Sequence, residues 1–116
     1  MDYVHINLGY LEMVSGGDRE IISELIDIFR QQSKEFHEEM LSLCGTKLYP
    51  ELGQLAHKAK SSVAIMGMEK LASRMKHLEV SAREGDNPEE YSEIIEFFRS
   101  ESALALEELD DYLKRI

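Results

Sequence analysis

The chain has 116 residues, of which 43% are hydrophobic, and a formal net charge of −10 at pH 7. Its length suits one domain with one hydrophobic core, and its apolar content is too high for a disordered chain. The negative charge argues against binding to nucleic acid or to an anionic membrane surface, because both attract cationic proteins. We therefore expect a single domain over residues 1–116 that binds neither nucleic acid nor membranes.

Further exclusions come from the apolar runs and from the metal-ligating residue types. No run of apolar residues approaches the roughly 20 that cross a bilayer, and residues 1–5 do not resemble the start of a signal peptide. The single cysteine, Cys44, cannot form an internal disulfide. No two of the four histidines lie three or four residues apart, which argues against a zinc site on one helix. We expect a cytoplasmic protein without a metal or other cofactor.

The first part of the chain predicts a short helix and then a long one. The short helix is expected over Leu8–Val14, with Asn7 as its cap. Gly16-Gly17-Asp18 then supplies a break and a second N-cap. Apolar residues recur after it at steps of three, four and seven as far as Leu43, and Cys44-Gly45 closes this long helix.

The rest of the chain predicts three more long helices. The first begins at Tyr49-Pro50 and runs to Gly67, and the second runs from Gly67 to Gly85. The last is expected to open at Asn87-Pro88-Glu89-Glu90, with Asn87 as its N-cap, and to continue to about Lys114. Strand and hairpin signals are absent. The predicted fold class is therefore all-α: an antiparallel four-helix bundle with a short additional N-terminal helix.

His57 is the most informative residue of the helix expected to start at Tyr49-Pro50. The buried stripe of this helix is predicted to consist of Leu52, Ala56, Ala59, Val63 and Met66. At about 100° per residue, His57 lies away from this stripe and faces solvent. Its neighbours on the outer face are predicted to be mostly small, with Lys60 one turn further on: Gly53, Gln54, Ser61 and Ala64. An exposed neutral imidazole is a competent nucleophile at neutral pH, and a nearby ammonium stabilises a phosphoryl group.

Basic residues are concentrated around the same helix. From Lys47 to Lys76 the chain has six basic and two acidic residues, although the whole protein is strongly acidic. A basic region within an acidic protein indicates a face that binds an anionic partner.

The segment Ala56-His57-Lys58-Ala59-Lys60-Ser61-Ser62-Val63-Ala64-Ile65-Met66-Gly67 resembles the signature of the histidine phosphotransfer (HPt) domain family. Gly17-Asp18-Arg19-Glu20 and His77–Asp86 resemble two flanking segments of that family, so that the similarity covers about Leu8 to Asp86. The family usually has glycine directly after the lysine, where this chain has Ser61. We expect this serine to change the fit to a partner and not to abolish the function.

The resemblance implies a phosphoryl carrier of a two-component multistep phosphorelay. His57 would be the phosphoacceptor and Lys60 would stabilise the phosphoryl group. The residues expected to adjoin or dock a partner are Gln54, Lys58, Ser61, Ala64, Ile65 and Gly67. The partners implied are receiver domains and a hybrid sensor kinase, with magnesium held by the receiver and not by this chain.

Neither an ATP-binding domain nor a phosphate-binding Gly-rich loop is present in the sequence, so we expect a carrier and not an autonomous kinase. We also expect a monomer. The alternative reading is a helical-bundle adaptor that binds a signalling partner through the same face without phosphorylation, since a fold does not determine a function.

Overall fold

A computed structural model describes residues 3–116, which form helices and no strand. Residues 1 and 2, which belong to the stretch considered for a signal peptide, lie outside the described residues. The elements are α1 (Gly9–Ser15), α2 (Arg19–Gly45), α3 (Tyr49–Ile65), α4 (Glu69–Glu84), a 3-10 helix (Pro88–Glu90) and α5 (Tyr91–Arg115). The predicted all-α class is confirmed.

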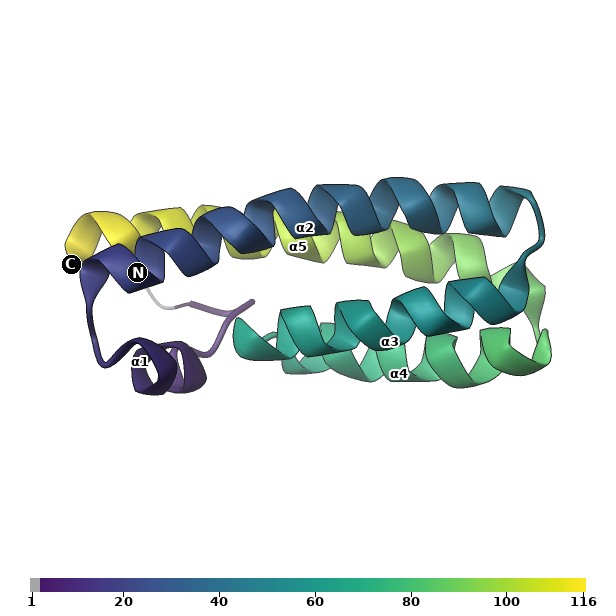
Figure 1. The fold of residues 1–116 in the computed structure, drawn as a ribbon, viewed down its shortest axis with the longest axis horizontal. Coiled ribbons are helices and arrows are strands. Elements are labelled where there is room, and N and C mark those ends of the chain that lie inside the picture. Colours follow the sequence, from purple (N-terminus) through teal and green to yellow (C-terminus); the bar gives the residue numbers. More distant parts are fainter. Residues whose placement is uncertain (1–2) are drawn as a thin grey trace.

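The four long helices pack in two layers. Figure 1 shows α2 beside α5 in one layer and α3 beside α4 in the other. Three-residue connections, 46–48 and 66–68, join α2 to α3 and α3 to α4. All five residues of the predicted α3 stripe are buried, and they pack against apolar side chains of the other helices. On α5, Leu104 is 37% exposed, whereas the neighbouring Ala105 is buried.

Of the three predicted helix N-caps, Asp18 is confirmed, whereas Asn7 and Asn87 are not the caps that the sequence predicted. The Asp18 side chain accepts a hydrogen bond from the Ile21 amide (3.2 Å), as expected of an N-cap. Asn7 lies one residue before the N-cap of α1, and its side-chain oxygen accepts from the Gly9 amide (3.0 Å). Asn87 was wrongly predicted to cap α5. Its backbone is left-handed (φ 52°), its side chain makes no capping hydrogen bond, and the 3-10 helix follows it.

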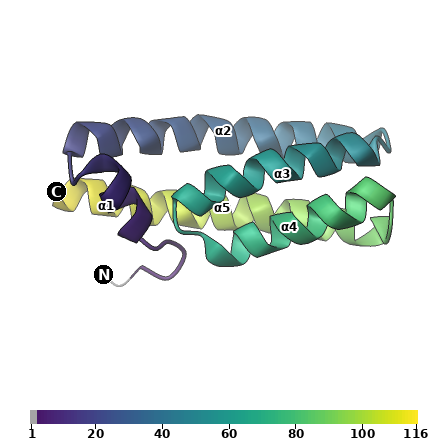
Figure 2. The same cartoon turned by 60° about the horizontal axis from the view of Figure 1, so that its bottom comes forward.

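The N-terminal segment, residues 3–7, lies between α1 and the α3–α4 connection and leads into α1 (Figure 2). It is attached to α5, where the Glu108 carboxylate accepts hydrogen bonds from the Val4 amide (3.2 Å) and the His5 amide (2.9 Å). The same segment passes directly over the α3–α4 connection at Gly67. A Cβ atom on Gly67 would lie 2.1 Å from the Asn7 carbonyl oxygen, and the φ of Gly67 is 72°. Gly67 is therefore required both for the turn and for this close contact.

Candidate functional site

His57 stands on α3 with 60% of its side chain exposed. Its Nδ1 atom lies 3.0 Å from the Oε2 atom of Glu79 on α4. The Glu79 side chain is only 4% exposed, so that a buried carboxylate contacts an exposed imidazole. Because an ionised carboxylate only accepts hydrogen bonds, this contact favours the tautomer that has its proton on Nδ1. The second ring nitrogen, Nε2, is then unprotonated and available as a nucleophile.

Two cations share the Glu79 carboxylate with His57. Arg83 donates from Nη2 to Oε2 (2.9 Å), and Lys60 places its Nζ 3.5 Å from Oε1. Within residues 3–116, Oε1 has no hydrogen-bond partner, which leaves the ion pair with Lys60 as its main polar contact. The site therefore combines one imidazole, one carboxylate and two cations within direct contact distance.

The Glu79 carboxyl group has a pKa below its ordinary value. Burial alone would raise this pKa, but the hydrogen bond with His57 and the charges of His57, Lys76 and Lys60 outweigh that effect. Glu79 is therefore ionised at neutral pH and able to accept a hydrogen bond from the Nδ1–H group of His57.

Gly53 explains how α4 comes close enough to α3 for this contact. A Cβ atom on Gly53 would lie 2.9 Å from the Glu79 carbonyl oxygen and 3.1 Å from the Arg83 amide nitrogen. The sequence analysis placed Gly53 on the open outer face beside His57, and this was wrong, because Gly53 is buried between the two helices. Its role is to allow the backbones to approach, and the absence of a side chain is what permits this.

The other predicted site residues differ in exposure, and two of them, Ile65 and Gly67, lie at the far end of α3 near α1 and the N-terminal segment. Gln54, Lys58, Ser61 and Ala64 are exposed, whereas Ile65 and Gly67 are half-buried. The helix that reaches His57 is α4. The helix α2 meets α3 on another flank, where the Ser62 hydroxyl donates to Gln32 (2.8 Å).

An apolar surface formed by α1 and the end of α3 adjoins these residues. Tyr10 lines a shallow depression together with Ser61, Ala64 and Ile65. Tyr10 is 48% exposed and Met13, further along α1, is 70% exposed. Sequence reasoning missed both side chains, because nothing in the α1 sequence shows that this helix lies beside α3.

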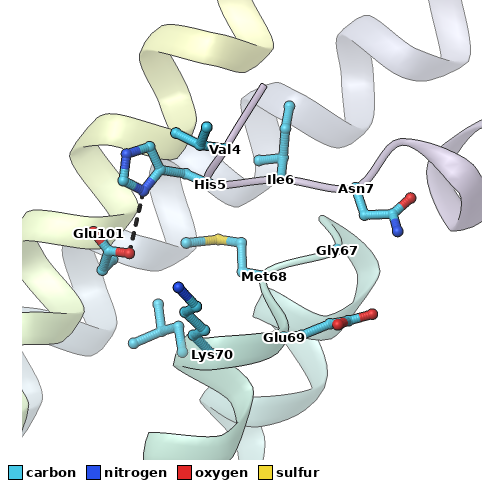
Figure 3. A pocket seen from close by; sticks show the side chains of 10 residues that line it. Val4, His5, Ile6, Asn7, Gly67, Met68, Glu69, Lys70 and Glu101 are labelled. Carbon is cyan, nitrogen blue, oxygen red and sulfur yellow. Dashed lines mark hydrogen bonds and ion pairs between the residues drawn. The ribbon is translucent and has the colours of Figure 1, made fainter. Parts of the chain in front are cut away.

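Two of the other histidines, His5 and His77, have partners of their own. His5 lies 3.2 Å from Glu101 in a pocket of about 180 Å³ between the N-terminal segment and the α3–α4 connection (Figure 3). His77 lies 3.0 Å from Glu90 on the surface. Residues 3–116 contain no group of three or more His, Cys, Asp or Glu residues arranged to hold a metal ion. No helix among these residues is long and apolar enough to span a membrane.

The sequence matches the model of the Hpt domain family over residues 24–116. This match covers most of the chain, which therefore belongs to the Hpt domain family. Membership places it among the histidine phosphotransfer proteins of two-component phosphorelays. Comparison with curated proteins and with solved structures found no match.

Proposed function

We propose that this chain carries a phosphoryl group on Nε2 of His57 and passes it between the aspartates of receiver domains. The contact between exposed His57 and buried Glu79 is the observation that carries the proposal. Glu79 accepts a hydrogen bond from Nδ1, and this leaves the lone pair of Nε2 free to act as the nucleophile. Neither His5 nor His77 has a buried carboxylate of this kind beside it, since Glu101 is 18% and Glu90 is 47% exposed.

The transfer step uses the lone pair of Nε2. This lone pair attacks the phosphorus of a receiver's aspartyl phosphate, and the bond between phosphorus and the aspartate oxygen breaks with its electrons left on the carboxylate. The imidazole becomes positively charged because it keeps its proton on Nδ1. Glu79 is placed to stabilise this charge through the 3.0 Å contact. Transfer to a second receiver reverses the step.

Lys60 and Arg83 are the cations that we assign to the phosphoryl oxygens. Both lie at the Glu79 carboxylate, and their side chains are 28% and 61% exposed. Each can therefore turn toward a group attached to Nε2 while remaining near Glu79. Phosphoryl transfer depends mainly on positioning and charge stabilisation, which these residues supply together.

The partners that we propose are receiver domains and a hybrid sensor kinase. The basic side chains of Lys58, Lys60 and Arg83 would face the acidic active site of a receiver, which also supplies the magnesium ion. The apolar surface at Tyr10 and Met13 would bury against the same partner. In this proposal the chain is one domain, a monomeric antiparallel four-helix bundle that functions as a carrier and not as a kinase.

The proposal is tested by phosphotransfer from a panel of radiolabelled, phosphorylated receiver domains in the presence of magnesium. Native protein should acquire acid-labile, base-stable label, and His57→Gln should acquire none. His77→Gln is the matched control, because His77 is also exposed and hydrogen-bonded to a glutamate. This control should be labelled like the native protein.

Two results would lead to a different account. Label that persists in His57→Gln and disappears in His77→Gln would move the site to α4. If no receiver labels the native protein, and native and His57→Gln bind the same receivers equally well, an adaptor without phosphorylation would be the better description.

A further inference from the structure

A groove between α2 and α5 has a basic lining that the phosphotransfer proposal does not use. It has a volume of about 310 Å³, within the range of small-molecule sites. One face of each helix lines the groove, and on each helix the lining residues recur at steps of three, four and seven positions. The main lining residues are Arg30, Lys34 and His37 of α2 and Arg99, Ser102 and Leu106 of α5.

The cations of this groove retain unused hydrogen-bond donors. Arg30 pairs with Asp110 through one terminal nitrogen, and Arg99 pairs with Glu96. Each guanidinium has five N–H donors, so donors remain for a further anion. Within residues 3–116, Lys34 forms no ion pair. Asp110 and Glu96 neutralise two of the three Lys and Arg side chains, so the groove keeps one uncompensated positive charge, on Lys34, in a protein whose net charge is −10.

Ser102 supplies a second and independent observation. The residue lines the groove, is 4% exposed, and its hydroxyl oxygen has no hydrogen-bond partner in the described part of the chain. Buried hydroxyl groups almost always have a partner, because an unpaired one is costly. This oxygen is closed to solvent in the unliganded protein, so an acceptor reaches it when the side chains at the floor of the groove shift around an entering ligand.

We propose that this groove binds a small molecule that carries two negative charges on oxygen atoms, either a phosphate ester or a dicarboxylate. The oxyanion accepts hydrogen bonds from Lys34, Arg99 and Ser102, and the rest of the ligand lies on Ala103 and Leu106. The site goes beyond the proposed phosphotransfer function and does not depend on it.

The groove belongs to the layer that does not carry His57. Figure 1 shows α2 and α5 in one layer, whereas His57 and Glu79 lie on α3 and α4 of the other. A ligand in the groove therefore leaves the surface around His57 open. We expect phosphotransfer to proceed with the ligand bound.

The test is an NMR titration of the ¹⁵N-labelled full chain at constant ionic strength. Inorganic phosphate and succinate are the two probes, and sodium chloride is the blank. Saturable shifts of the amides of Lys34, His37, Arg99 and Ser102 with either probe support the site, and the probe that binds more tightly identifies the oxyanion. Shifts that stay linear with concentration, or that spread over all basic residues, overturn the proposal.

Three variants separate the site from general charge effects. Lys34→Gln should weaken binding by about tenfold, the loss of one charge-assisted hydrogen bond. Lys58→Gln removes the same charge on α3 and should leave binding unchanged. Ser102→Ala should weaken binding without lowering the melting temperature of the unliganded protein, because its hydroxyl is unpaired there. Equal weakening by Lys34→Gln and Lys58→Gln would contradict a defined site.

Discussion

At the scale of single residues, the pairing of His57 with Glu79 determines what the site can do. An exposed histidine alone is common, and its neutral ring exchanges between two tautomers. The buried carboxylate selects one tautomer, because it accepts a hydrogen bond from the protonated Nδ1 and leaves Nε2 unprotonated. It also places a negative charge next to an imidazole that becomes a cation when it is phosphorylated.

Glu79→Gln tests this role. The amide oxygen of glutamine can still accept a hydrogen bond from Nδ1, but it has no charge to stabilise the cationic ring. Loss of a charge-assisted hydrogen bond of about 1.5–3 kcal/mol should slow phosphotransfer to His57 by roughly 10- to 100-fold. Rapid-quench measurement of single-turnover transfer would give this rate. An unchanged rate in a correctly folded variant would exclude Glu79 as a positioning residue.

The depressed pKa of Glu79 predicts how its stabilising effect depends on pH. Its pKa is lower in the folded protein than its ordinary value of 4.5, so the ionised form is favoured by folding. The contribution is complete above the unfolded pKa and is lost as the pH falls through the folded pKa. Urea unfolding at pH 7 should therefore show a higher free energy of unfolding for the native protein than for Glu79→Gln, by about 1 kcal/mol. This difference should shrink below pH of about 4, and a constant difference would contradict the assignment.

At the scale of the elements, the distance between α3 and α4 places the site. This distance is set at Gly53, where a side chain would collide with the backbone of α4 beside Glu79 and Arg83. Gly53→Ala should therefore destabilise the protein by about 1–3 kcal/mol, as overpacking does, and should also slow phosphotransfer because Glu79 moves relative to His57.

Gly45→Ala is the matched control for Gly53→Ala. Gly45 is also a helical glycine with negative φ, but nothing lies within 4 Å of the position that its Cβ would take. This variant should change the free energy of unfolding by less than about 0.5 kcal/mol. If urea unfolding showed the same loss of stability for both substitutions, the close contact of Gly53 with α4 would not be the cause of the destabilisation.

Local sequence signals predicted the elements better than their contacts. Asp18, Pro50 and Gly85 mark helix ends in the structure as they do in the sequence. Asn87 was misread because an asparagine before a proline suits both an N-cap and a left-handed turn. The burial of Gly53 was missed for a different reason: a helical wheel shows which way a residue faces, but not how closely a neighbouring helix approaches it.

At the scale of the whole molecule, the sequence predicted the helical class and the exposure of His57, but not the site around it. Exposure follows from the period of one helix. The contact with Glu79 depends on how α4 is placed along α3, and the glutamate lies 22 residues further along the chain. The basic region between Lys47 and Lys76 anticipated Lys60 but not Arg83, which lies outside it and reaches the site only through the fold.

The most direct test of the account is to determine where the phosphoryl group is attached. Protein with ¹⁵N-labelled histidine would be phosphorylated by a receiver domain and examined by ¹⁵N and ³¹P NMR. The account predicts one phosphoryl group, on Nε2 of His57, with Nδ1 still protonated and contacting Glu79. A phosphoryl group on Nδ1 of His57, or on any other histidine, would contradict it.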